Sequence, residues 1–486
     1  MVKAAHTGTV DMGFGRPTVP QMPEGYYSGD QPNPNLRAFV EAHLRERPYD
    51  PATDAYDIPA FDQPIETTKA TAIYNMHTYW SKKPHDAIRQ YIRHYTQPGD
   101  LVLDPFCGSG GTALAALMDG RKAIAIDRSP AATFITKNYC TPVDVHELRT
   151  AFEELKRKVK PEIDWLYETR CDRCGGKATT GYTVYSQVFQ CGRCLNKVPL
   201  FDCEPVESRT RAGKPKNVRV CPHCVARGIM EEISSRGEHF GAVPVLVSYL
   251  CKSGCAHARG ERQHNDLDQK KREYFEQYDL GKIREIDAKT IPHWYPDAEL
   301  SEVIPYRMLH KKDFRPTDAK RLIDLFTKRN LWALAALREA AEEMPDCVSR
   351  HVTLFALTAV SLGMSRMNQY RPDVSYPTSV MKGTYYVPQI FQEELVIKHV
   401  EHKIDRLIKG LEVIAASVEG RDLLIDTRSA IDLTPIPNAT IDFIFTDPPY
   451  AGSVQYGELN FVWEAWLGLD THWHDEEIII NEVRGK

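Results

Sequence analysis

The stretch that decides the fold is Leu101-Val-Leu-Asp-Pro-Phe-Cys-Gly-Ser-Gly-Gly-Thr112. It opens with an apolar run that ends in an acid, Asp104, as a short buried strand does. Gly108 and Gly110 then permit a tight turn with positive φ and a close approach of the backbone to a ligand. A helix rich in Ala and Leu is predicted over 112–118. A strand, a glycine-rich turn and a helix form the first unit of a doubly wound sheet.

The same unit continues into a second strand that also ends in an acid. Lys122-Ala-Ile-Ala-Ile leads to Asp127, at the position where such sheets hold ribose hydroxyls. Asp104, at the end of the first strand, can hold an ammonium group. The Lys and Ser/Thr of a phosphate-binding P-loop are absent. The spacing therefore favours a cofactor that contains adenosine and has no phosphate to cradle.

Asp-Pro-Phe-Cys-Gly-Ser-Gly resembles the cofactor motif of amino-methylating DNA methyltransferases, apart from Gly111 before Thr112, where that family often has Thr directly. The resemblance implies S-adenosylmethionine as cofactor, with its methionine amino group on Asp104 and its ribose on Asp127. It also implies that the pocket is lined by Pro105, Phe106, Gly108 and Gly110.

A second part of the chain resembles the same family just upstream. His77-Thr-Tyr-Trp-Ser-Lys-Lys-Pro84 is similar to the motif that flanks the cofactor site and precedes the glycine-rich strand. The resemblance adds Lys83 and Pro84 to the cofactor-binding residues. A lysine and a proline at this place are equally compatible with an ordinary helix start, because Pro is common in the first turn.

Residues able to act on an amine follow a late apolar strand predicted over 441–445. This strand runs into Thr446-Asp-Pro-Pro-Tyr450. An exocyclic amine on a base is a poor nucleophile, because its lone pair is delocalised into the ring. Asp447 and the Pro448 carbonyl can accept its two protons, while Pro448 and Pro449 stiffen the turn. Tyr450 offers a face on which a base that has left the helix can stack.

Asp-Pro-Pro-Tyr resembles the catalytic motif of adenine-N6 methyltransferases, whereas cytosine-N4 enzymes more often carry Ser first. The resemblance implies methyl transfer to an exocyclic amine of DNA, with adenine N6 favoured. Cytosine N4, an RNA amine, and a non-catalytic zinc-containing DNA-binding subunit of a split methyltransferase stay open as alternatives. One departure concerns the acid that often contacts the cofactor adenine: a gapless alignment places Arg428 there, and Asp426 lies two residues earlier.

Eight of the twelve cysteines lie in four short pairs within one segment, and we expect them to bind zinc. The pairs are Cys171/Cys174, Cys191/Cys194, Cys221/Cys224 and Cys251/Cys255. Paired cysteines in a chain without a secretion signal indicate metal rather than disulfides. The 16 residues between the first two pairs match zinc-ribbon spacing. The first two pairs are thus expected to share one ion and the last two, with His223 and His257 as substitutes, a second. A crossed pairing, with the second pair joined to the third, stays open.

The net charge of -5 does not indicate a nucleic-acid binder, but the charge is unevenly distributed. Residues 151–272 carry roughly 22 Lys and Arg against 15 Asp and Glu, a local excess that phosphate contacts need. The basic stretch 208–219 lies between cysteine pairs and is either a DNA-contacting loop or a surface loop. No run of about 18 apolar residues and no signal peptide are present, which predicts a cytoplasmic protein without a membrane span.

We therefore expect an α/β fold, a doubly wound S-adenosylmethionine-dependent methyltransferase sheet interrupted by a zinc-binding, partly helical insert. The expected segments are an irregular N-terminal arm (1–70), the cofactor-binding part (71–145), the zinc-binding insert with a role in DNA recognition (146–275), a helical region (276–420) and the catalytic part (421–486). Only 36 residues follow Tyr450, so the catalytic part is expected to be incomplete at its C-terminus. DNA is the expected partner, and a C-terminal continuation or partner subunit and a cognate restriction or defence component are further candidates.

Overall fold

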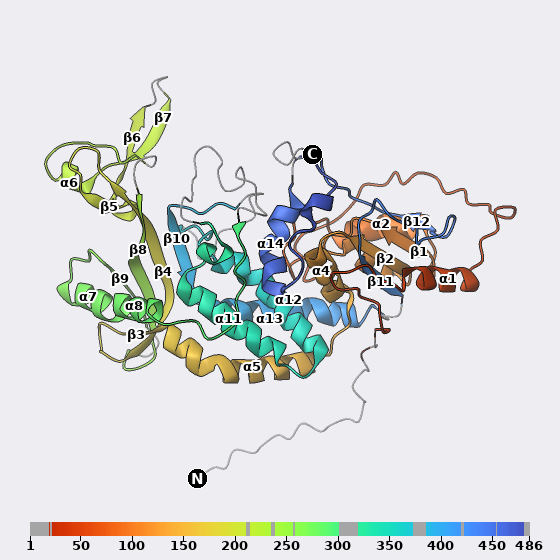
Figure 1. Ribbon diagram of the computed structural model, residues 1–486, viewed down its shortest axis with the longest axis horizontal. Helices are drawn as coiled ribbons and strands as arrows, with labels where there is room; N and C mark the ends of the chain where they lie inside the picture. The colour runs from red at the N-terminus through yellow and green to blue at the C-terminus, as the bar shows by residue number, and fades with distance from the viewer. Residues whose placement is uncertain are drawn as a thin grey trace, which may run out of the picture.

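The computed structural model describes residue 19 and residues 22–209, 214–234, 239–255, 258–300, 319–372, 385–418, 422–452 and 454–480. A parallel sheet lies at one end of the molecule and an antiparallel sheet at the other, with a group of long helices between them (Figure 1). The predicted α/β class with a parallel sheet is confirmed. The long antiparallel strands of the insert were not predicted.

The parallel sheet has the strand order β11-β2-β1-β12. Its strands are β1 (Leu101–Asp104), β2 (Lys122–Asp127), β11 (Leu423–Thr427) and β12 (Phe443–Ile444). All three pairings are parallel. Burial on both faces of a parallel sheet explains the uninterrupted apolar runs that made these strands recognisable in the sequence. Because the strands are parallel, their carboxyl ends meet at one edge, where Asp104, Asp127 and the segment after β12 come together.

Helices cover both faces of this sheet. α2 (His85–Tyr95), α3 (Gly111–Met118) and α4 (Pro130–Cys140) belong to the main core on one face. α1 (Leu36–Glu46) covers the other face, where Leu36 and Val40 pack with apolar residues of β1, β2 and β11. Tyr27 also bridges to Ile425 of β11. The described part of the segment expected to be an irregular arm is therefore integral to the sheet, because that face would otherwise be exposed to water.

The helices in the middle of the molecule share the core of the parallel sheet. They are α5 (Val145–Leu166), α11 (Lys328–Glu342), α12 (Cys347–Ser361), α13 (Val396–Ala415) and α14 (Tyr456–Leu467). Shorter helical segments are α7 (Gln269–Tyr274), η2 (Phe275–Leu280), α8 (Gly281–Asp287), η3 (Leu322–Leu325), η4 (Leu362–Met364) and η5 (Trp473–Glu476). α5 packs against α11 and α12, so the separate fold of the insert begins after α5 rather than at residue 146.

The insert is built on a long two-stranded ribbon. β4 (Lys177–Gln190) pairs with β8 (His239–Cys251), and β9 (Arg259–Gln263), β3 (Glu168–Arg170) and β5 (Lys197–Pro199) extend the sheet. A hairpin of β6 (Pro205–Arg209) and β7 (Pro215–Arg219) projects from one end, beside η1 (Leu200–Asp202) and α6 (Pro222–Val225). Figure 1 shows this hairpin as the outermost part of the insert.

A strand from the helical region ties the insert to the rest of the protein. The region 276–420, expected to be helical, contains a strand, β10 (Ile390–Glu394), which pairs with β4. Glu393 of β10 is buried against Arg329 of α11, which also donates to Thr183 Oγ1 of β4 over 2.7 Å. Pairing with β4 and a buried ion pair outweigh the local preference of these residues for helix.

Two surface properties of the fold bear on the predictions. By length and composition α12 with η4 could cross a membrane, but 67% of this 18-residue window is buried inside the protein, as in a core helix.

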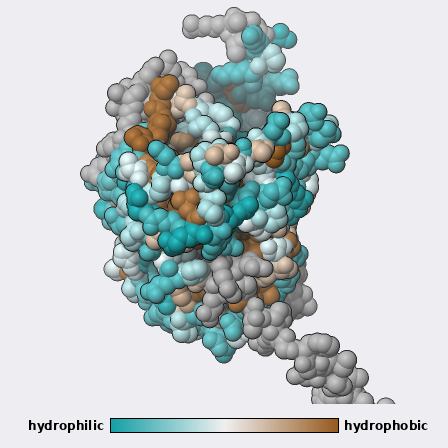
Figure 2. Space-filling view, turned by 90° about the vertical axis from the view of Figure 1, so that its right-hand side faces the viewer, coloured by the Kyte–Doolittle hydropathy of each residue, from teal (hydrophilic) through white to brown (hydrophobic). Residues whose placement is uncertain are grey.

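β12 is an edge strand of the parallel sheet, and Ile444 is 55% exposed. The end of the molecule that carries this sheet is largely hydrophilic, with a few apolar patches (Figure 2).

Candidate active site

A pocket opens at the carboxyl ends of the parallel strands. Of the predicted site residues, those that line it are Lys83, Asp104, Pro105, Phe106, Gly108, Asp127, Asp447 and Pro449. They come from the segment before α2, from the turns after β1 and β2, and from the turn after β12. The structure thus brings the predicted cofactor residues and the predicted catalytic turn to a single cavity.

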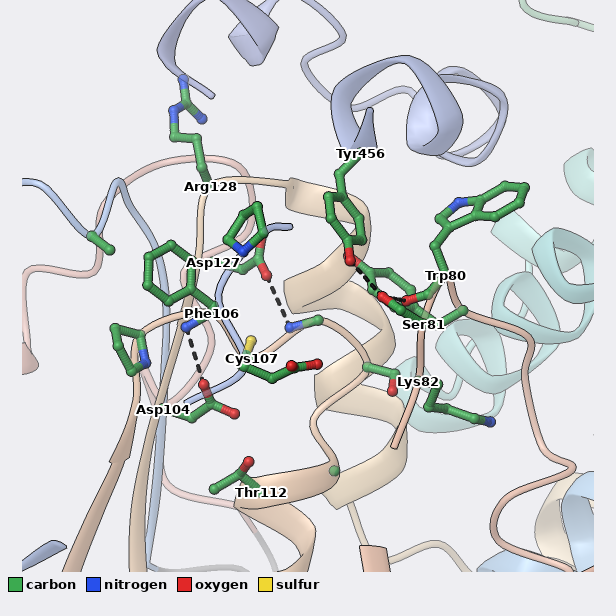
Figure 3. A pocket seen from close by; sticks show the side chains of 18 of the residues that line it. Trp80, Ser81, Lys82, Asp104, Phe106, Cys107, Thr112, Asp127, Arg128 and Tyr456 are labelled. Carbon is green, nitrogen blue, oxygen red and sulfur yellow. Dashed lines mark hydrogen bonds between the residues drawn. The ribbon is translucent and has the colours of Figure 1, made fainter. Parts of the chain in front are cut away.

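Asp104 and Asp127 lie at the floor of the pocket and are held by backbone amides (Figure 3). Phe106 N donates to Asp104 Oδ1 over 3.1 Å, while Gly108 N and Ser129 N each donate to Asp127 over 2.9 Å. Burial raises the pKa of Asp104 to about 7 and the pKa of Asp127 to about 6. Within the described ranges, no Lys, Arg or His forms a salt bridge with either carboxyl group. The floor therefore suits a ligand that brings a positive charge and hydroxyl donors.

The turn between β1 and α3 requires its glycines. Gly108 and Gly110 have φ of 52° and 79°, which other residues rarely adopt. A Cβ on Gly110 would lie 2.8 Å from the Thr136 side chain, and a Cβ on Gly108 would lie 2.9 Å from Tyr79. Gly108 lines the pocket, whereas Gly110 packs behind it against α4. The predicted turn is confirmed, with a structural rather than a ligand-facing place for Gly110.

The turn after β12 holds its carboxylate in a closed arrangement. Tyr450 Oη donates to Asp447 Oδ1 over 2.6 Å, and Lys83 Nζ donates to Asp447 Oδ2 over 2.5 Å and to Tyr450 Oη over 3.1 Å. Burial lowers the pKa of Lys83, but the bonds to Asp447 and Tyr450 outweigh it and raise that pKa overall. Pro448 and Tyr450 do not line the pocket itself, and Tyr450 is 49% exposed. Lys83 thus faces the turn after β12, while Pro84 lies at the N-cap of α2, as the helix-start interpretation predicts.

Several residues that line the pocket were missed by sequence reasoning. They include Tyr79, Ser81, Arg128, Ser429, Ala430, Tyr456, Trp473, Glu476, Glu477 and Ile478. Tyr456 extends from α14 toward Ser81, and their hydroxyl oxygens lie 2.5 Å apart (Figure 3). Tyr456 follows the Asp-Pro-Pro-Tyr turn by only a few positions, which was the one available signal. Tyr79 and Ser81 lie inside the His77–Pro84 motif, and the remaining residues have no local pattern that distinguishes them.

Asp426, the candidate for contact with the cofactor adenine, does not line the pocket and forms its hydrogen bonds elsewhere. Asp426 is buried, and its carboxylate accepts from Asn33 N over 2.6 Å and from Arg428 Nε over 2.7 Å. It therefore fixes the N-terminal segment to β11. Ser429 and Ala430, not Asp426 or Arg428, line the pocket on this side.

The eight paired cysteines form two groups of four, each with its sulfur atoms within 4.8 Å of one another. One group is Cys171, Cys174, Cys251 and Cys255, and the other is Cys191, Cys194, Cys221 and Cys224. The closest sulfur pairs lie 3.6–3.8 Å apart. Four sulfurs at about 2.3 Å from a tetrahedral zinc ion would be about 3.8 Å apart. Both groups fit a structural zinc ion.

The favoured pairing of the first two Cys-x-x-Cys turns is wrong, and the crossed alternative is the observed one. β4 lies between Cys174 and Cys191, and a strand of 14 residues is about 45 Å long at 3.3 Å per residue. The two turns are therefore at opposite ends of the ribbon and cannot share an ion. His223 is in neither group, and His257 lies outside the described residues.

Some cations of the basic stretch 208–219 form ion pairs or hydrogen bonds within the protein. Lys216 pairs with Glu232 over 2.7 Å, and Arg219 Nη1 donates to the carbonyls of Leu200 and Cys203. Residues 210–213 lie outside the described residues. The described part of the β6–β7 hairpin thus offers fewer cations to phosphate groups than its sequence indicates.

Comparison with known proteins gives the class of the cofactor-side segment. Residues 23–138, which run from before α1 through most of α4, match the N6_N4_Mtase family model, described as DNA methylase. The chain is 27% identical over 101 residues to the Type II methyltransferase M.MjaII of Methanocaldococcus jannaschii, a match that covers 21% of this chain and 19% of that relative.

Shorter matches reach higher identity. The Type II methyltransferase M1.MboII of Moraxella bovis is 48% identical over 50 residues, which is 10% of this chain and 19% of the relative. M.EcaI of Enterobacter cloacae is 45% identical over 51 residues, 10% of this chain and 11% of the relative. The chain thus aligns with about a fifth or less of the length of these relatives. No solved structure matches the chain. The matches support an amino-methylating DNA methyltransferase.

Proposed function

We propose that this protein transfers a methyl group from S-adenosylmethionine to an exocyclic amino group of a DNA base, with adenine N6 favoured. One observation carries the proposal: three strands of one parallel sheet bring Asp104, Asp127 and Asp447 to a single pocket. Ligands of doubly wound sheets bind at this edge. The similarity of residues 23–138 to DNA methylases supports the same assignment.

The residues present fit the cofactor. Burying two carboxyl groups is costly when neither forms a salt bridge within the described residues, and a ligand with an ammonium group and a vicinal diol would relieve that cost. Asp104 would hold the ammonium group of the methionine part and Asp127 the ribose hydroxyls. When bound, the cofactor supplies an electrophilic methyl group on a sulfonium sulfur.

The catalytic turn would prepare the amine. Asp447 and the Pro448 carbonyl would accept the two N–H groups of the target amine and direct its lone pair at the methyl carbon. A nitrogen–carbon bond forms as the carbon–sulfur bond breaks, and the excess proton leaves the nitrogen through Asp447. In the free protein both Asp447 oxygens accept from Lys83 or Tyr450. An entering base must therefore displace at least one of these donors, at the time that it leaves the DNA stack.

The experiment that tests the proposal is methyl incorporation with radiolabelled S-adenosylmethionine. Duplex DNA and RNA are offered in parallel, and the product is digested to nucleosides and identified by chromatography. Labelled N6-methyl-2′-deoxyadenosine from DNA would support the proposal, whereas N4-methyl-2′-deoxycytidine or labelled RNA would support an alternative amine. No transfer to any substrate by a protein that binds DNA would favour the non-catalytic subunit.

We also propose zinc at both cysteine groups and DNA as the partner of the insert. Four thiols at tetrahedral spacing favour zinc, and thiolates are required for its coordination. The two ions would clamp the two ends of the β4–β8 ribbon and so stiffen the insert beside the catalytic fold. A restriction or defence partner and a cytoplasmic location stay predictions.

A further inference from the structure

The described chain ends in a strap, residues Asp470–Ile480, that crosses the mouth of the pocket. Trp473, Glu476, Glu477 and Ile478 of the strap line the cavity. Arg128, the residue after Asp127, extends away from the pocket floor toward the C-terminal part of the chain (Figure 3). Its Nε donates to Glu476 Oε2 over 2.7 Å. Ile480 N donates to the Ala451 carbonyl over 3.3 Å. The strap is thus anchored both beside the predicted ribose site and beside the catalytic turn.

A buried acid of α14 joins the strap to the pocket floor. Trp473 Nε1 donates to Glu464 Oε1 over 2.8 Å, and Ser129 Oγ donates to the same oxygen over 2.7 Å. Ser129 N in turn donates to Asp127 Oδ1 over 2.9 Å. Two hydrogen bonds on one carboxyl oxygen therefore fix the indole of the strap relative to the turn that carries Asp127.

The rest of the same helix face points into this network. Tyr456, Asn460 and Glu464 are spaced by four residues and so lie on one face of α14. Asn460 Nδ2 donates to Ser129 Oγ over 3.0 Å and to Tyr79 Oη over 3.3 Å. Glu464 is fully buried, and burial raises its pKa to about 8. Burying a carboxyl group costs free energy that an apolar residue would avoid, so packing alone does not account for it.

We propose that Trp473 forms a wall of the cofactor site against the adenosine part of the ligand, and that Glu464 is the positioning residue that holds it there. The inference rests on the proposed function, because it takes the ligand to be S-adenosylmethionine. Trp473 lines the cavity together with Asp127, where an aromatic side chain suits contact with a purine. The strap would then be a binding element of the pocket rather than a cover that only packs on it.

The test is calorimetric titration of S-adenosylmethionine into the full chain and four variants. Trp473→Phe, which removes the bond to Glu464 and part of the ring, should weaken binding about threefold to tenfold. Glu464→Ala should weaken it to a similar degree, and Glu464→Gln, which keeps the acceptor oxygen, should restore it. The Trp473→Phe/Glu464→Ala double variant should bind no more weakly than the weaker single variant, because the two residues act as one unit.

Trp466→Phe is the matched control. Trp466 lies on α14, as Glu464 does, and packs against Phe326. Its indole nitrogen has no hydrogen-bond partner within the described residues. This variant should bind like the wild type. As a second readout, cofactor binding should change the tryptophan fluorescence of the wild type and of Trp466→Phe, and this change should be largely lost in Trp473→Phe.

The outcomes separate the two proposals. Wild-type binding with unchanged affinity in Trp473→Phe and Glu464→Ala would overturn the role of the strap and leave the proposed function intact. A folded wild type that binds no S-adenosylmethionine would overturn the proposed function and this inference together. If Glu464→Ala does not fold, Trp473→Phe and its fluorescence still decide the matter.

Discussion

Lys83 and Asp447 are 364 residues apart in the chain, and their side chains meet across 2.5 Å at the pocket. Lys83 lies just before α2 on the cofactor side of the fold, and Asp447 follows β12 on the catalytic side. This contact joins the segment before α2 to the turn after β12, two parts of the pocket that the insert separates in sequence. Both residues are partly exposed, with 42% and 31% of their side chains accessible, so an entering substrate can reach them.

Asp447→Ala should reduce methyl transfer by about 100-fold or more, because the acceptor for the amine protons is lost. Cofactor binding should stay near the wild-type value, since Asp104 and Asp127 are untouched. Initial rates on duplex DNA and calorimetric titration of S-adenosylmethionine measure the two effects. Turnover close to that of the wild type would show that another group accepts the protons.

Lys83→Met should lower turnover by about tenfold while cofactor affinity changes little, because Lys83 contacts the catalytic carboxylate rather than the pocket floor. A tenfold loss of turnover corresponds to about 1.5 kcal/mol, the free energy of one hydrogen bond to a charged group. Single-turnover rates with saturating DNA and cofactor measure it. A large loss of cofactor affinity with unchanged turnover would instead support the direct cofactor contact that the motif predicts.

Asp104→Asn should weaken S-adenosylmethionine binding by roughly 1.5–3 kcal/mol, because a charged hydrogen bond is lost. In the wild type, affinity should increase as the pH rises through about 7, the pKa of Asp104 in the free protein, because the carboxylate and not the acid holds an ammonium group. Titration at pH 6, 7 and 8 should show this dependence, and Asp104→Asn should flatten it. An affinity in the wild type that does not vary with pH would contradict the assignment.

The same raised pKa of Asp104 predicts a direction for stability. A carboxyl group whose pKa is higher in the folded than in the unfolded state binds protons more tightly when folded, so folding is favoured at low pH. The contribution of Asp104 should be fully present below about pH 4 and should be lost as the pH rises to about 7. Thermal melting of the ligand-free wild type and of Asp104→Asn should converge at acidic pH and show the variant as the more stable protein at pH 8.

Zinc analysis of cysteine double variants tests the observed grouping. The purified chain should contain two zinc ions. Cys171→Ser/Cys251→Ser should lose one ion, because both residues belong to one group, whereas Cys171→Ser/Cys191→Ser should lose both. Cys203→Ser, which changes a buried cysteine outside both groups, is the control. Loss of a single ion in the second double variant would restore the sequential pairing.

Arg329→Met should destabilise the protein by about 3–5 kcal/mol, because it leaves Glu393 buried without its partner. The double variant Arg329→Met/Glu393→Gln should recover much of that loss, since no isolated charge remains. Urea denaturation followed by far-UV circular dichroism measures both. Equal stability of Arg329→Met and the wild type would show that the contact between α11 and β10 does not hold the insert to the helices.

The sequence by itself determined the parts of this protein that are local. β1, β2 and β11 were recognisable because burial makes them largely apolar, and β12 by its short apolar run. Asp104, Asp127 and Asp447 were recognisable because each ends a strand or opens a turn. Gly108 and Gly110 were recognisable since a tight turn needs their backbone freedom. The spacing within each cysteine pair indicated metal binding, and that spacing depends only on one short turn.

Tertiary structure alone decided the relationships between distant segments. The partners of each cysteine pair depend on the length of β4, a strand whose alternation is hidden because much of it is buried on both faces. The partner of Lys83, the cover that α1 provides, and the place of Trp473 all depend on contacts between separate elements of the fold, some of them hundreds of positions apart. No local propensity encodes such contacts, because the free energy that selects them comes from burial and hydrogen bonding that exist only once the chain has folded.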